Sequence, residues 1–219
     1  MMKKLTPVLI STIALLIFLA ACTSSTPNSS AESKPAAKPA FQPTYLTGRE
    51  ALQKMYIAAR TWAPDAKPYN LQSVTTKNAN GQDGRAGIWG AGFASASKGQ
   101  LKVFSWSGIK SDDAPAPGVS TRPEDTYNPA NTSTAVFDMA YVKIDSGGPE
   151  KSTALSVAEE HGGDKLIKAD KNINVYYSLS WHARDNQLVW RVSFGQEQNQ
   201  LKLSVDVDAS TGAFIKTEK

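Results

Sequence analysis

Apolar and polar residues alternate with a period of two through the last third of the chain. Three runs show this pattern, at residues 175–182, 188–194 and 201–208, and polar turn residues separate them. A last turn at residues 208–212 leads into a short final strand at residues 213–216. Such regular alternation predicts an antiparallel sheet with one buried face and one wetter face.

The first half of the chain predicts a helix followed by strands. Thr47 and Glu50 have the spacing of a capping box, and apolar residues then recur at helical intervals as far as Trp62. The dipeptide Ala63-Pro64 ends this helix. Strands are predicted after it at residues 71–77, 88–96 and 101–106.

A second helix is predicted to begin near Pro149, because proline is favoured at the first helical position. Its apolar stripe consists of Ala154, Leu155 and Ala158. The glycine pair at residues 162–163 ends it, directly after His161. Residues 135–144 predict a further strand just before this helix.

The two halves of the chain repeat at a nearly constant spacing. Three segments of the first half, at residues 51–52, 88–93 and 100–102, match later segments at offsets between 100 and 103. This repetition suggests duplication. We therefore expect an α+β fold of two tandem units, at residues 46–109 and 134–219, each a helix packed on an antiparallel sheet of three to four strands. Residues 110–133 hold four prolines and are expected to form a loop or an insert between the units.

The N-terminus has the composition of an export signal. Lys3 and Lys4 precede an apolar stretch of fourteen residues, 8–21, that is broken only by Ser11 and Thr12. This stretch is shorter than the roughly twenty residues of a membrane span. Leu19-Ala20-Ala21-Cys22 closes it and resembles the lipobox of a bacterial lipoprotein signal. The alternatives are an ordinary signal peptide or a membrane anchor with an incidental cysteine.

The lipobox resemblance implies that residues 1–21 are a signal peptide and that Cys22 carries lipid, such as palmitate, on the mature chain. Residues 22–45 are rich in Ser, Pro and Ala, so they predict a disordered tether after the lipidated Cys22. The expected location is the cell envelope. For a host with two membranes it is the outer membrane facing the periplasm, because Thr23 and not an aspartate follows the cysteine.

Charge and cysteine content exclude several classes of function. Removing Lys3 and Lys4 with the signal lowers the formal net charge from +4 to +2, so the sequence gives no reason to expect nucleic-acid binding. Cys22 is the only cysteine. Once it is acylated, no thiol remains for a disulfide, a cysteine-based metal site or redox chemistry.

The second half, over about residues 135–219, combines a helix with Ala154-Leu155, a tryptophan strand at 188–194 and the ending Asp208-Ala209-Ser210-Thr211-Gly212. In these features it resembles the PepSY family. The first half departs from this ending, with Ser105-Trp106-Ser107-Gly108 in its place. The resemblance implies a small helix-plus-sheet unit of exported proteins, a proposed role in restraining peptidases, and no catalytic residues.

Candidate chemical groups are few. His161 and His182 are expected to be partly exposed and without a special role, and a metal site would need more ligands than these two. Asp206 and Asp208 share one strand face and could do acid–base work or bind a cation, but solvated carboxylates are the more usual outcome. Asp208 is also placed to accept amide hydrogen bonds in the terminal turn. Trp106 is expected to be the most exposed tryptophan.

These observations favour a non-catalytic envelope lipoprotein that binds or modulates peptides or proteins, with a peptidase as one candidate partner. The alternative is a structural or assembly factor of the envelope that has no peptidase role. We expect no enzyme activity, cofactor or metal, and contact with the membrane through the lipid on Cys22. An exposed sheet edge is the expected place for an extended peptide to bind.

Overall fold

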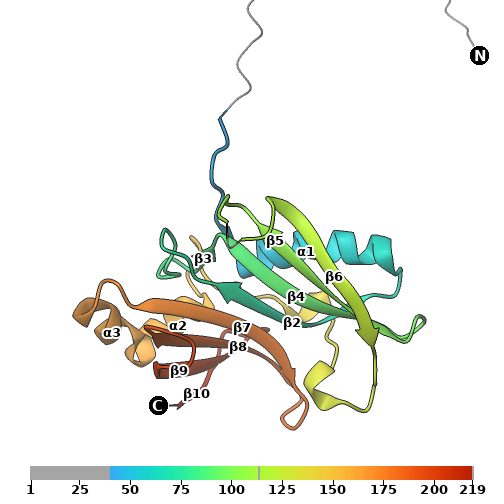
Figure 1. The fold of residues 1–219 in the computed structure, drawn as a ribbon. Helices are drawn as coiled ribbons and strands as arrows, with labels where there is room; N and C mark the ends of the chain where they lie inside the picture. The colour runs from blue at the N-terminus through green and yellow to red at the C-terminus, as the bar shows by residue number, and fades with distance from the viewer. Residues whose placement is uncertain (1–39, 113, 219) are drawn as a thin grey trace, which may run out of the picture. The chain divides into compact units, whose positions relative to one another are not determined.

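Eight strands of the computed structural model form one antiparallel sheet in the order β10-β9-β8-β7-β2-β4-β5-β6 (Figure 1). The structure describes residues 40–112 and 114–218. Cys22, the signal peptide and most of the expected tether lie outside these residues. The α+β fold class predicted from the sequence is confirmed.

Each half of the chain contributes four neighbouring strands. The first four are β2 (Lys67–Val74), β4 (Ile88–Ser95), β5 (Gln100–Ser107) and β6 (Gly118–Thr126). The second four are β7 (Asn174–His182), β8 (Gln187–Gly195), β9 (Leu201–Asp208) and β10 (Phe214–Glu218). The strands β1 (Leu46–Thr47) and β3 (Arg85–Ala86) form a separate two-stranded sheet. The two halves join where Leu71 of β2 pairs with Leu179 of β7.

The helices begin at capping boxes. Helix α1 (Gly48–Trp62) is capped by Thr47 and Glu50, as predicted. Helix α2 (Ala154–Ala158) is capped by Thr153 and Ser156, so the predicted start near Pro149 is wrong. A π-helical turn, η3 (Glu159–Gly163), and helix α3 (Asp164–Ala169) follow. The expected end at the glycine pair is therefore only a kink in the structure. Short 3-10 turns occupy η1 (Thr132–Thr134) and η2 (Met139–Tyr141).

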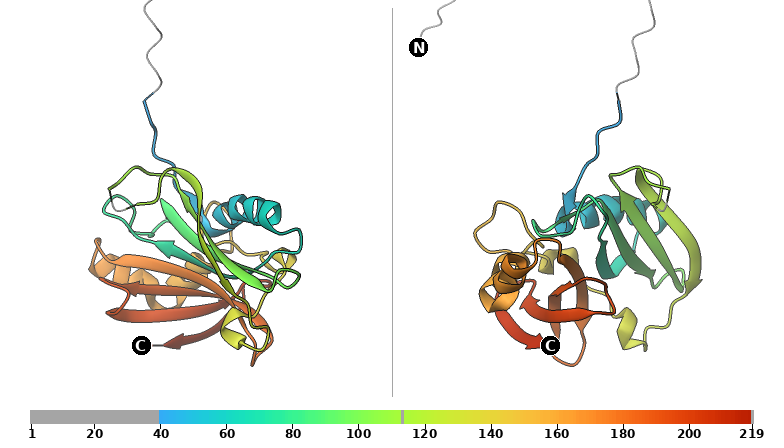
Figure 2. Two further views of the ribbon diagram at one scale, coloured as in Figure 1. Left: turned by 45° about the vertical axis from the view of Figure 1, so that its right-hand side comes forward. Right: turned by 60° about the vertical axis from the view of Figure 1, so that its left-hand side comes forward.

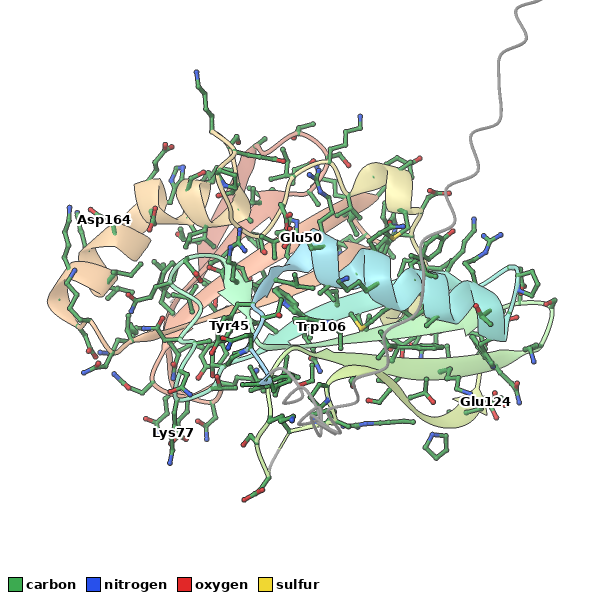
Figure 3. All side chains as sticks on the ribbon, turned by 90° about the horizontal axis from the view of Figure 1, so that it is seen from above. Tyr45, Glu50, Lys77, Trp106, Glu124 and Asp164 are labelled. Atoms are coloured by element: carbon green, nitrogen blue, oxygen red, sulfur yellow. The ribbon has the colours of Figure 1, made fainter. Side chains whose placement is uncertain are left out.

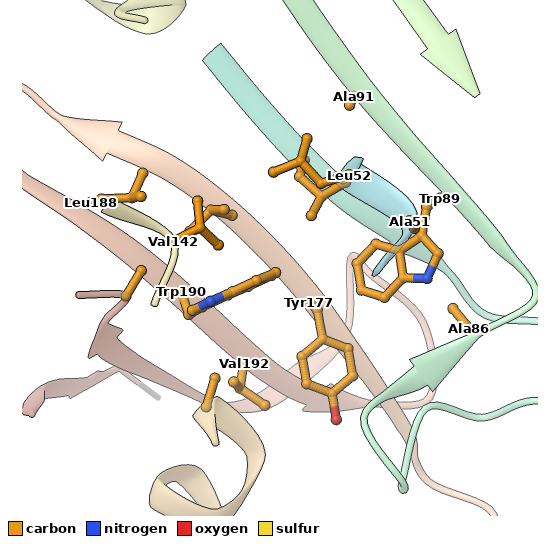
Figure 4. Packing of buried hydrophobic residues seen from close by; sticks show 14 of the residues in the cluster. Ala51, Leu52, Ala86, Trp89, Ala91, Val142, Tyr177, Leu188, Trp190 and Val192 are labelled. Atoms are coloured by element: carbon orange, nitrogen blue, oxygen red, sulfur yellow. The ribbon is translucent and has the colours of Figure 1, made fainter. Parts of the chain in front are cut away.

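Both helical segments pack on the same face of the sheet, and the other face is left open (Figures 1 and 2). Trp89 and Trp190 are fully buried on the helix-covered face (Figure 4). Their indole N–H groups donate to the carbonyl oxygens of Leu46 and Ile144, each at 2.9 Å. A Cβ on Gly48 would lie 2.5 Å from Cη2 of Trp190, so the first turn of α1 needs glycine to approach the second half.

The predicted division into two separate sheets is not confirmed. A single hydrophobic cluster contains residues of both halves, and one sheet runs through both. Asp145, which precedes α2, also caps α1 of the first half: it accepts from the Thr47 hydroxyl at 2.7 Å and from the Arg49 amide at 2.9 Å. The halves are thus joined through sheet, core and helix cap.

The secondary structure of three segments differs from the prediction. Residues 118–126 form the edge strand β6 and not a loop, because their amides pair with β5 despite Pro123. Residues 135–144 are irregular apart from the 3-10 turn η2, and they form no strand. Regular backbone contacts also begin before the expected end of the tether at residue 45, because the Thr44 amide donates to the carbonyl oxygen of Gly108 at 2.8 Å.

The expected exposure of Trp106 is wrong. Trp106 is paired directly with Trp89, so both side chains lie on the helix-covered face, and Trp106 is only 5% exposed. Phe104 lies on the same face and is 2% exposed. Leu101 and Val103 alternate with these residues along β5, so they lie on the open face.

Candidate functional site

A pocket of about 530 Å³ opens on the otherwise open face of the sheet, at the end of β2 and the start of β4. Residues 41–45 lead into β1 from above the domain as Figure 1 draws it, and we call them the strap. The pocket between the strap and the sheet is called the strap pocket. Its lining residues are Phe41, Pro43, Tyr45, Val74, Thr75, Thr76, Lys77, Asn78, Ile88, Ile109, Lys110, Ser111 and Ala114.

Three backbone groups hold the strap and the residue after it in place. The Thr44 amide bonds to the Gly108 carbonyl, and the carbonyl of Tyr45 accepts from Nη1 of Arg85 at 3.3 Å. The next carbonyl, of Leu46, accepts from the indole of Trp89. A Cβ on Gly108 would lie 2.1 Å from the Thr44 carbonyl oxygen, so only glycine allows this close crossing.

The floor of the strap pocket is apolar. Val74 and Ile88 are paired directly across β2 and β4, and their neighbours Ser73 and Trp89 point to the helix-covered face, so both floor side chains point to the open face. Val74 is 41% exposed, although its apolar neighbours Ile88 and Ile109 are only 7% and 8% exposed. Phe41 adds a ring that is 39% exposed. The pocket therefore leaves apolar surface open to solvent.

The rim of the pocket is polar and carries positive charge. Lys77 lies in the loop after β2, and Lys110 lies after β5 with its Nζ 4.6 Å from the centre of the Phe41 ring. Figure 3, seen from above, labels Tyr45 near the middle of the view and Lys77 toward its lower left. No carboxylate lines the pocket among the described residues. The buried Thr76 hydroxyl has no hydrogen-bond partner among those residues.

Sequence reasoning missed this pocket. The prediction included the strap in the tether because residues 22–45 as a whole are rich in Ser, Pro and Ala. The aromatic residues of that segment, Phe41 and Tyr45, both lie in the strap. Val74 and Ile88 lie within the predicted strands at residues 71–77 and 88–96, and strand position alone does not mark them. A large apolar residue on the polar face of a strand, close to an aromatic segment, was the available signal.

The two histidines do not come together. His161 stacks on Phe214, with ring centres 3.6 Å apart, and Phe214 shares the helix-covered face with its pairing partner Val207. His182 pairs with Gln187 on the opposite face of the sheet. Strands β8 and β9 also separate β7 from β10. The structure gives these histidines no shared chemistry.

The two aspartates of β9 have separate structural roles. Asp206 was expected to be solvated, but it is 1% exposed and is bound by Arg191 through Nε at 2.7 Å and Nη2 at 2.8 Å. This bidentate pairing raises the pKa of Arg191. Asp208 accepts from the amides of Ser210 and Thr211, each at 2.8 Å, in the turn where the sequence placed it.

The sheet edges are poorly suited to added strands. Edge strand β6 contains Pro123 and has a register shift opposite Lys102 and Phe104. The other edge, β10, has a register shift between Phe214 and Lys216. Proline, charge and bulges are the features that discourage strand addition at an edge. The strap pocket is therefore a better candidate site than either edge.

The described residues contain no group of three or more His, Cys, Asp or Glu side chains placed to hold a metal ion. None of the helices within residues 40–112 and 114–218 is long and apolar enough to cross a membrane.

Comparisons with known proteins locate the fold but not a family. No protein-family model matches the chain, and no curated protein matches it significantly. Among solved structures, it is similar to the crystal structure of a candidate lipoprotein from Clostridium difficile 630, with a TM-score of 0.50 and 11% sequence identity. The match covers 77% of this chain and 91% of that chain. At this identity the likeness shows a shared fold, and the resemblance to the PepSY family stays a prediction.

Proposed function

We propose that the chain is a non-catalytic, lipid-anchored protein of the cell envelope that binds an apolar segment of a peptide or protein in the strap pocket. The observation that carries this proposal is the apolar floor of the strap pocket, where Val74 is 41% exposed beside the buried Ile88. The pocket volume of about 530 Å³ falls in the usual range for a ligand site, about 300–1,000 Å³.

Two further observations support the parts of this proposal that concern location and mode of action. The lipobox ending at Cys22 and the fold shared with a candidate lipoprotein support an anchored envelope location. The separation of His161 from His182, and the structural pairing of Asp206, support binding over chemistry. A peptidase belongs among the partners to test because the resemblance to PepSY domains implies one.

The experiment measures peptide binding by isothermal titration calorimetry. It uses residues 22–219 with Cys22→Ser, which contain the whole compact unit of residues 41–219. An acetylated apolar tetrapeptide should bind, and Val74→Asp should weaken that binding at least ten-fold because it places a charge on the apolar floor.

The matched control is Leu201→Asp on β9. Leu201 is also 41% exposed and does not line the pocket, so this variant should bind as the unmodified chain does. Equal binding by the Val74 and Leu201 variants would show that the pocket is not the site. A parallel assay with active envelope peptidases tests whether the chain inhibits them.

A further inference from the structure

The strap pocket combines an apolar floor with a rim of one charge sign. Lys77 and Lys110 are the charged residues among its lining, and neither forms an ion pair with any described residue. Asp112 is exposed in the adjacent loop but does not line the pocket. A bound group between the two ammonium groups would therefore meet a positive potential.

The rim also offers hydrogen-bonding groups suited to a peptide backbone. Asn78 supplies an amide, and Thr75 and Ser111 supply hydroxyls. The Thr76 hydroxyl oxygen is buried, so it is not among the groups that a ligand at the rim contacts.

From these observations we propose that the strap pocket selects the carboxyl terminus of an apolar peptide. Apolar side chains of the ligand lie on Val74 and Ile88, and its terminal carboxylate lies between Lys77 and Lys110. This inference rests on the proposed function, since it names the ligand class of the same pocket. It adds a preference for a negative charge, which peptide binding in general does not require.

The expected size of the preference follows from the exposure of the lysines. Lys77 and Lys110 are both exposed, and ion pairs at exposed sites contribute about 0.2–1 kcal/mol each. Two such contacts correspond to a preference of roughly two- to thirty-fold. Because salt screens exposed charges, the preference should shrink in 1 M salt.

The experiment compares two acetylated apolar tetrapeptides of the same sequence, one with a free carboxylate and one with a carboxamide. Titration calorimetry with the Cys22→Ser chain of residues 22–219 should show several-fold tighter binding of the acid. The double variant Lys77→Gln/Lys110→Gln should bind the two peptides equally. The matched double variant Lys54→Gln/Lys165→Gln removes two exposed lysines elsewhere and should keep the preference.

Each failure has a distinct meaning. Equal binding of acid and amide by the unmodified chain overturns the carboxylate preference and leaves the proposed function standing. Loss of the preference in the Lys54 and Lys165 variant also overturns it, because the effect would then arise from net charge. Dodecanoate is the third probe, and binding of dodecanoate tighter than that of the peptide acid overturns the assignment to a peptide. Absence of binding by either peptide contradicts the proposed function itself.

Discussion

Replacing Asp145 with alanine should destabilise the whole domain, because this carboxylate joins the two halves. Asp145 is 5% exposed and accepts hydrogen bonds from the Thr47 hydroxyl at 2.7 Å, the Arg49 amide at 2.9 Å and the Ser146 amide at 2.7 Å. The first two donors belong to the beginning of α1. The helix of the first half is therefore capped by a residue that follows in the chain some hundred positions later.

The magnitude can be estimated donor by donor. Thr47 is 3% exposed and Ser146 is fully buried, so the alanine variant leaves two buried donors without this partner. A buried donor left unsatisfied costs about 1–3 kcal/mol, and loss of a helix cap costs about 1 kcal/mol. Arg49 keeps its contact with Glu150 at 2.9 Å, so no unpaired buried charge is created. We expect a loss of about 3–7 kcal/mol in the free energy of unfolding.

Urea unfolding followed by tryptophan fluorescence and by circular dichroism measures this loss. The unmodified chain should unfold in one transition by both signals, because the halves share one sheet and one core. Asp145→Asn keeps one carbonyl acceptor and should lose less than Asp145→Ala. Asp138→Ala is the matched control, since this exposed cap accepts from the Ala140 amide alone, at 2.9 Å, and should cost about 1 kcal/mol or less.

Two results would refute the reasoning. A loss below about 1 kcal/mol for Asp145→Ala would show that the cap does not couple the halves energetically. Two separate transitions in the unmodified chain would show that the halves are independent units, as the sequence repeat alone suggests.

Three other predictions follow from the sequence and the structure. Trp89→Ala and Trp190→Ala should each cost about 3–5 kcal/mol in urea unfolding because both rings are fully buried, and an unchanged midpoint would contradict their placement. Hydrogen bonds, first from Ser95, lower the pKa of Asp65 from 3.8 to about 2, so its stabilising effect is fully present above pH 3.8 and is lost as the pH falls through 2. The difference in urea midpoint between the unmodified chain and Asp65→Asn should therefore become smaller as the pH is lowered from 3.8 to 2. Cys22→Ser should abolish incorporation of labelled palmitate, and continued labelling would exclude Cys22 as the lipid site.

The sequence predicted the second half of the sheet well, because its strands have one apolar and one polar face. Alternation at β7, β8 and β9 assigned Tyr177, Leu179 and Trp190 to the buried side, where the structure has them. The same method failed at β5, which carries large apolar residues on both faces. Leu101 and Val103 lie on one face of this strand, and Phe104 and Trp106 lie on the other. The period-two pattern alone therefore cannot tell which face is buried.

The remaining errors concern features set by tertiary contacts. Edge strand β6 has the composition of a loop, since nearly all its side chains are exposed, and only its backbone pairing with β5 makes it a strand. The pairing of β2 with β7 joins segments from different halves, and no local pattern specifies it. Burial of Asp206 likewise depends on Arg191 from the neighbouring strand. The local sequence of a segment does not specify which distant residues it will contact.

The position of the strap links anchoring and binding in one short segment. Residues 41–45 end the part of the chain that was expected to be only a tether, and they also form one wall of the strap pocket. A ligand that packs on Val74 and Ile88 therefore contacts the strap, and its affinity includes the free energy of holding the strap against the sheet. A truncated chain that begins at Leu46 would retain the whole sheet and the capping box of α1, yet lose Phe41, Pro43 and Tyr45. Such a chain should fold with little loss of stability but bind the apolar tetrapeptide much more weakly, whereas a chain that begins at residue 40 should keep full affinity. Equal binding by the two chains would show that the strap is not part of the site.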